Sequence, residues 1–205
     1  MRNENPKLAQ YPKKVAIQGD AQVTIRPMEE DDFDRVRTFF NNLPREDRLF
    51  LRHDVTRPEV FARWFAELDY TKKLPLMALH GDAVVGHALL DAEQKGWSPH
   101  VAEIRVVVAD AFKKRAVGKV LAREIFDQAI ARGYEKVIAQ MMNNQAAARR
   151  MFERMGFIVE AELRDHVRDL DGKKHNLLIM SCALDDAWAK MEELLQDFSP
   201  WAGWG

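Results

Sequence analysis

The chain has 205 residues, enough for one sizeable domain with a hydrophobic core of its own. It carries 31 Lys and Arg against 32 Asp and Glu, and a formal net charge of −1 gives no overall attraction to nucleic acid or to a membrane surface. The single cysteine, Cys182, excludes an internal disulfide framework, and no apolar run reaches membrane-spanning length, so we expect a soluble, cytoplasmic protein.

The first half of the chain alternates between strand patterns and helical patterns. Residues 1–14 are mostly polar, and we expect them to form a flexible extension. Around Gly19-Asp20 apolar and polar side chains alternate, which is typical of a β-hairpin. Two segments with apolar residues at helical spacing follow, and then three apolar segments typical of strands. The expected helices are 29–43 and 57–69, separated by a charged loop at 43–54, and the expected strands are 74–80, 83–92 and 100–110.

The second half of the chain predicts two helices between strands. The first helix runs from Val117 to about Arg132 and ends before Gly133, and the second spans 143–157 with an Asn N-cap. The stripe expected to be buried on the first helix consists of Val117, Val120, Leu121, Ile125, Phe126, Ala129 and Ile130. The remaining strands are expected at 134–142, 157–169 and 174–185.

This order of elements predicts an α/β (α+β) fold, a mixed central sheet with helices on its faces. We expect residues 187–205 to form an amphipathic helix followed by an aromatic tail. Such a surface would serve a partner, and a homodimer through this helix is one possibility.

Lys113, Lys114 and Arg115 stand directly before the helix that begins near Val117. Cations are unfavourable at the positive end of a helix dipole unless an anion is bound there. A strand, a short loop and a helix N-terminus can together hold phosphate through free N–H groups. The loop is therefore a candidate pyrophosphate site, and the alternative is an ordinary solvated run of charges.

Several motifs, in this order, resemble the GNAT superfamily of N-acetyltransferases. Lys113 to Gly118 lies over the pattern Gln/Arg-x-x-Gly-x-Gly/Ala that wraps the coenzyme A pyrophosphate, but Lys113 replaces Gln or Arg and Ala116 replaces the first glycine. The Ala116 methyl group either crowds the approach of the backbone to the phosphate or is tolerated if its φ is negative. The segment "AEIRVVVADAFKKRAVG" is similar to that of Pat-type protein lysine acetyltransferases. "VTIRPMEEDD", "NNLPREDRLFLRHD" and "NNQAAARRMFERMGF" resemble further segments of the family.

The resemblance implies a GNAT domain at 15–186 that binds acetyl-CoA as its co-substrate. The loop and helix start would hold the pyrophosphate, the preceding strand would contact the pantetheine arm and the oxyanion through its backbone, and an amide side chain would lie near the pantetheine. The implied residues are Lys113, Lys114, Arg115, Ala116, Val117, Gly118 and Lys119, then Val106, Val107 and Val108, and finally Asn144 or Gln145. For Asn144 a helix N-cap is the competing interpretation.

Glu103 is the candidate general base that takes the proton of an acceptor amine. It lies in an apolar strand, where partial burial tunes carboxyl groups toward proton transfer, and it matches the base of Pat-type enzymes. The alternative is an ion pair with Arg105 on the same strand face. His87 is a candidate for lining the acceptor site or an ordinary structural histidine. Phe152 replaces the tyrosine that protonates the departing thiolate in many family members, and we expect it in the core.

We therefore expect an acetyl-CoA-dependent N-acetyltransferase that acetylates a primary amine directly, on a protein lysine or a small molecule. Its acceptor site is expected in the loops 42–57 and 91–100. No nucleic acid or membrane partner is expected. No metal is expected either, since no Cys/His cluster has metal-ligand spacing. The alternative, favoured by Ala116 and Phe152, is a catalytically impaired acyl-CoA-binding or regulatory module.

Overall fold

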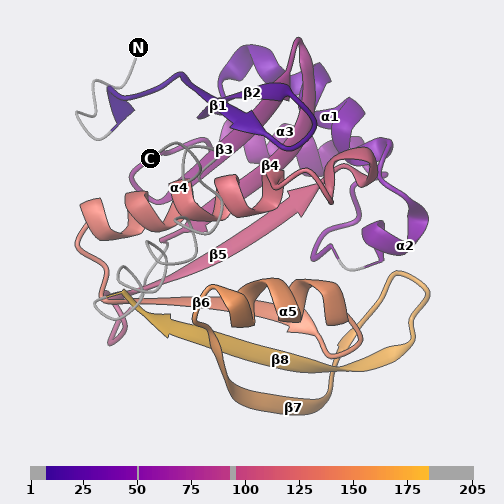
Figure 1. Cartoon of the computed structure of the whole chain (residues 1–205). Helices are drawn as coiled ribbons and strands as arrows, with labels where there is room; N and C mark the ends of the chain where they lie inside the picture. Colours follow the sequence, from indigo (N-terminus) through magenta and orange to yellow (C-terminus); the bar gives the residue numbers. More distant parts are fainter. Residues whose placement is uncertain (1–7, 50, 93–95, 185–205) are drawn as a thin grey trace.

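The computed structural model describes residues 8–49, 51–92 and 96–184, so the expected C-terminal helix and tail at 187–205 lie outside the described residues. Eight strands form one sheet in the order β1-β2-β3-β4-β5-β6-β8-β7, with helices on both faces (Figure 1). The strands are β1 (Lys13–Ile17), β2 (Ala21–Pro27), β3 (Lys73–His80), β4 (Ala83–Asp91), β5 (Val101–Val108), β6 (Lys136–Met142), β7 (Ile158–Arg168) and β8 (Lys174–Ala183). The α-helices are α1 (Phe33–Asn41), α2 (Arg45–Arg48), α3 (Pro58–Ala66), α4 (Val117–Ala131) and α5 (Ala146–Arg154), and the 3₁₀ helices are η2 (Glu30–Asp32) and η3 (Asp110–Phe112).

The sheet has a hydrophobic core on each face, because successive side chains of a strand point to opposite sides. On β3, Leu76 and Ala78 pack with α4 and α5, whereas Met77 and Leu79 pack with α1 and α3. The mixed sheet that the order of elements predicts is thus confirmed.

The predicted hairpin and long helix are both present. β1 pairs antiparallel with β2 around Gly19 and Asp20, which both have positive φ. In α4 the predicted stripe is buried except at Val120, which is partly buried against the core, and at Ile130, which is 37% exposed. Ile130 is rotated by about 100° from the buried Ala129, and so it faces away from the sheet. The buried stripe includes the polar Gln128 instead.

Two local features differ from the sequence prediction. The charged loop contains α2, a single helical turn whose four residues carry no apolar periodicity that could have revealed it. At the other end, the predicted domain boundary at residue 15 falls inside β1. Tyr11 and Lys13, both within the predicted extension, contact the Glu124 carboxylate on α4 at 2.9 Å and 2.7 Å.

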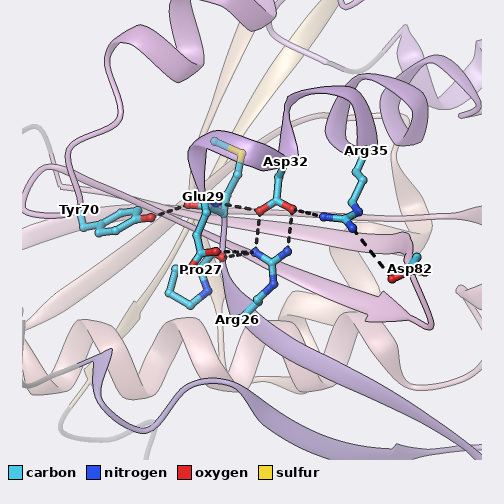
Figure 2. Close-up of polar contacts among 8 residues, drawn as sticks. Arg26, Pro27, Glu29, Asp32, Arg35, Tyr70 and Asp82 are labelled. Atoms are coloured by element: carbon cyan, nitrogen blue, oxygen red, sulfur yellow. Dashed lines mark hydrogen bonds and ion pairs between the residues drawn. The ribbon is translucent and has the colours of Figure 1, made fainter. Parts of the chain in front are cut away.

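A buried ion pair fixes the start of α1 to the end of β2 (Figure 2). The Asp32 side chain is 1% exposed, and both of its oxygens accept hydrogen bonds from the Arg26 guanidinium at 2.6 Å. Arg35 donates to the same carboxylate at 3.2 Å, and the Glu29 N–H donates at 2.9 Å. Next to it, the Tyr70 hydroxyl donates to the Met28 carbonyl at 2.6 Å. These contacts place α1 over β3 and β4.

The parallel strands β5 and β6 lie side by side at their beginnings and then diverge (Figure 1). They pair only over Val101–Glu103 and Lys136–Ile138, although each strand continues for four or five residues. β5 stays with β4 and β6 stays with β8. The backbone edge of β5 from Ile104 to Val108 therefore has no partner strand among the described residues.

Among the described residues, no helix combines the length and the apolar character needed to cross a lipid bilayer.

Candidate active site

Glu103 lies at the point where the sheet opens, because it is the last residue of β5 that pairs with β6. Its neighbours Ala102 and Ile104 are buried in the core under α4, so the Glu103 side chain points to the opposite face of the sheet. The side chain is 14% exposed. A carboxylate thus lies beside the opening, on the face that α1 and α3 cover.

Two arginines hold the Glu103 carboxylate. Arg105 donates from Nε at 3.2 Å, so the ion pair considered as the alternative role is present. Arg52 donates from both terminal nitrogens, to Oε2 at 3.1 Å and also to Oε1. Arg52 further donates to Gln140 on β6 at 2.7 Å, and so it bridges the two diverging strands. The sequence pattern did not single out Arg52, which lies in a charged loop 51 residues before Glu103.

Ala116 lies in the left-handed region, with φ of 66° and ψ of 3°, so the condition of a negative φ, under which its methyl group would be tolerated, is not met. The chain turns at this residue from η3 into α4, and the Ala116 carbonyl accepts the first helical bond, from the Val120 N–H at 3.0 Å. An L-residue with a side chain pays about 1–2 kcal/mol for this conformation. The family pattern has glycine here, which adopts it without strain.

We predict that Ala116→Gly raises the free energy of unfolding by about 1 kcal/mol, since it removes most of the left-handed strain and loses a little to unfolded-chain entropy. Urea denaturation measures the change. The control is Ala147→Gly in α5, where the backbone is helical and glycine should lower stability by roughly 0.5–1 kcal/mol. Equal destabilisation by both substitutions would show that Ala116 is unstrained.

The cations of the predicted pyrophosphate loop differ in the groups that they contact. Lys113 forms ion pairs with Asp47 at 2.6 Å and with Asp110 at 3.2 Å. Burial alone would lower the pKa of Lys113, but these hydrogen bonds outweigh it, so the pKa lies above its ordinary value. The Arg115 guanidinium lies over the Phe112 ring, 5.3 Å from its centroid.

Lys114 is exposed, and no hydrogen bond or ion pair joins it to another described residue. Behind it, α4 begins at Val117 without a side-chain cap, since Ala116 has no group to offer. At Gly118 a methyl group would lie 3.4 Å from Val108 on β5 and 3.5 Å from Met151 on α5. The helix start, the free edge of β5 and α5 therefore converge at one place.

The predicted Asn144 cap is wrong. Helix α5 begins after Gln145, no side chain caps it, and Asn144 is exposed. The Gln145 side-chain oxygen instead accepts from the Met142 N–H at 2.8 Å, because the chain turns sharply from β6 into the helix. Phe152 is 5% exposed and packs edge-on against Phe157, as expected for a core residue.

A cavity of about 280 Å³ lies on the same face of the sheet as Glu103. Its apolar walls include Phe40 of α1 and Trp64 of α3, and its charged residues include Arg52 and Arg105. The expected loop 42–57 contributes to it, whereas the described part of the expected loop 91–100 contributes only its first residue, Asp91. Val107 lines the cavity, while Val106 and Val108 pack against the core under α4.

His87 also lines this cavity. It is 9% exposed, and burial, together with the charge of Arg105, lowers its pKa to about 4. The imidazole is therefore neutral near pH 7 and has one donor and one acceptor nitrogen.

A family model described as Acetyltransferase (GNAT) family matches residues 37–157, which is more than half of the chain. The chain therefore belongs to the GNAT acetyltransferase family.

Solved structures of the same fold agree with this assignment. The GNAT domain of S. lividans PAT superposes with a TM-score of 0.70 at 18% identity, over 85% of this chain and 98% of that one. YncA from Salmonella typhimurium, solved with its cofactor acetyl-CoA, gives 0.68 at 20% identity, over 80% and 94%. The ribosomal-protein-alanine N-acetyltransferase from Brucella melitensis gives 0.67 at 21% identity, over 78% and 98%. The GNAT fold that the sequence motifs predicted is confirmed.

Proposed function

We propose that the chain transfers an acetyl group from acetyl-CoA to a primary amine. The divergence of β5 and β6 beyond Glu103 carries this proposal. The free edge of β5 from Ile104 to Val108 offers backbone N–H and C=O groups, and an extended ligand with amide groups can add to such an edge as a further strand does. The pantetheine arm of acetyl-CoA is a ligand of this kind.

The start of α4 suits the pyrophosphate of the same ligand. A helix N-terminus without a capping side chain attracts anions through its N–H groups and its dipole. The amides of Val117 and Gly118 would contact the phosphates, and Lys114 would add its charge. Lys113, bound to Asp47 and Asp110, would hold the loop in place.

In the proposed reaction Glu103 removes a proton from the acceptor's ammonium group. Arg52 and Arg105 occupy three of the roughly four acceptor positions of its carboxylate, two on Oε1 and one on Oε2, so a position on Oε2 remains for the amine or for a relaying water. The amine nitrogen then forms a bond to the carbonyl carbon, its second proton passes to water, and the carbon–sulfur bond breaks. The thiolate takes its proton from water, because Phe152 has no proton to donate.

The transfer is proposed to be direct, within a complex of both substrates. Cys182, the one cysteine of the chain, lies in the last strand and is 6% exposed. Its side chain is part of the hydrophobic core and lies away from the opening. It is therefore not placed to form an acyl-enzyme intermediate.

The second candidate function is an acyl-CoA-binding or regulatory module without catalysis. Two guanidinium groups neutralise Glu103, Ala116 is strained where the family has glycine, and Phe152 is buried where a proton donor is common. These three observations support the second candidate.

Release of free thiol from acetyl-CoA in the presence of a panel of primary amines separates the two candidates. The proposed function predicts release that depends on both the protein and an amine. Saturable binding of acetyl-CoA without release for any amine would support the binding module.

A further inference from the structure

We propose that the cavity between α1, α3 and the sheet is the acceptor site, and that it takes a small primary amine on an aromatic body with a hydrogen-bonding group at its far end. The acetylation of an amine bound in this cavity depends on the acetyl transfer proposed above. The alternative acceptor, the side chain of a protein lysine, fits the cavity less well for the reasons below.

The cavity and Glu103 lie along one strip of the sheet. In the β4–β5 register Asp91 lies opposite Glu103, and His87 lies opposite Val107. Glu103 and Val107 are four residues apart on one face, which corresponds to about 13 Å along the strand. A ligand whose amine lies at Glu103 therefore extends along the strip toward His87.

His87 is a polar group without a protein partner at the far end of this strip. No hydrogen bond joins its ring to another described residue, and its ring contact is edge-on to Phe40 at 5.4 Å. The neutral imidazole can both donate to and accept from a hydroxyl group, so such a ligand would satisfy it.

The walls between the two ends combine apolar and aromatic side chains with the guanidinium group of Arg105. Trp64 and Phe40 pack edge-on with ring centroids 5.3 Å apart, and Leu89 and Val107 form the sheet side of the cavity. A volume of about 280 Å³ is at the lower end for ligand sites and suits a compact molecule. A lysine stem has no ring to pack against Trp64 and Phe40 while its amine lies at Glu103.

Isothermal titration calorimetry of the full chain with four amines tests this inference without relying on turnover. The probes are tyramine, phenethylamine, butylamine and an N-acetylated lysine amide. Tyramine and phenethylamine differ only in the hydroxyl group that is expected to reach His87. We expect tyramine to bind about tenfold more tightly than phenethylamine, and both to bind more tightly than the two amines that lack a ring.

Three variants locate the binding. His87→Leu is expected to weaken tyramine about tenfold and leave phenethylamine unchanged, whereas His87→Gln, which keeps a donor and an acceptor, is expected to retain the preference. Leu89→Trp fills the cavity and should abolish binding of both rings. Its matched control is Leu170→Trp, at an exposed position in the β7–β8 turn.

The inference is overturned if the lysine amide binds as tightly as tyramine, if no ring-bearing amine binds, or if Leu89→Trp leaves binding intact. Binding of tyramine in the cavity, combined with no thiol release from acetyl-CoA, would instead support the inference and refute the proposed transfer. The two proposals can thus fail separately.

Discussion

Replacing Glu103 by glutamine is expected to lower kcat/KM for acetyl transfer by about 10²–10⁴-fold, the contribution typical of a general base. Glutamine has nearly the same shape but does not take the proton of the amine. The dissociation constant of acetyl-CoA should not change, because the proposed contacts come from the backbone of β5 and from the loop before α4. Steady-state thiol release and a binding titration measure the two quantities.

The matched control for this substitution is Glu153→Gln. Glu153 is exposed on α5, where it pairs with Arg149, so its neutralisation should leave kcat/KM unchanged. An unchanged melting temperature of Glu103→Gln would show that the loss of rate is not a loss of folded protein. If Glu103→Gln keeps the rate of the wild type, Glu103 serves only to bind Arg52 and Arg105.

Replacing Asp32 by alanine is expected to lower the free energy of unfolding by about 3–5 kcal/mol. The substitution leaves the Arg26 guanidinium, whose side chain is 19% exposed, without the carboxylate that neutralises it, and breaking a buried ion pair on one side has an effect of this size. Urea denaturation at neutral pH measures the change. The control is Asp34→Ala, which removes an exposed pair with Arg37 and should change stability by less than about 1 kcal/mol.

The contribution of Asp32 should also depend on pH. Burial alone would raise the pKa of its carboxyl, but hydrogen bonds from Arg26 and from the Glu29 N–H outweigh it, so the pKa in the folded state lies below the ordinary value. The unfolded chain therefore takes up the proton first as the pH falls. The stabilisation is complete above the ordinary carboxyl pKa and is lost in acid, and the difference between wild type and Asp32→Ala should shrink there. Equal behaviour of the Asp32 and Asp34 variants would contradict this role.

Local patterns of the sequence were sufficient for most elements of the fold. Alternation around Gly19-Asp20 predicted the first hairpin, and helical spacing predicted α1, α3 and α4. Features without a periodic signal were missed. The turn α2 consists of charged residues only, and Ile130 lies just beside the stripe that packs on the sheet.

The candidate site depends on contacts that no local pattern contains. Arg105 is two residues from Glu103 on the same strand face, so their ion pair could be foreseen, whereas Arg52 reaches Glu103 only through the tertiary fold. The divergence of β5 and β6 is likewise a matter of which strands pair, and strand sequences do not specify partners. The positive φ of Ala116 follows from the turn into α4. An alanine disfavours a positive φ, so the residue type itself argued against it.

The central claim is that acetyl-CoA binds between β5 and β6 with its pyrophosphate at α4. The most direct test is to measure the melting temperature of the chain with acetyl-CoA, NAD or ADP at equal concentration. A ligand present at 100 times its dissociation constant stabilises the folded chain by about 2.7 kcal/mol. We predict that acetyl-CoA raises the melting temperature and that NAD and ADP do not. A melting temperature that none of the three raises would contradict the assignment of this site.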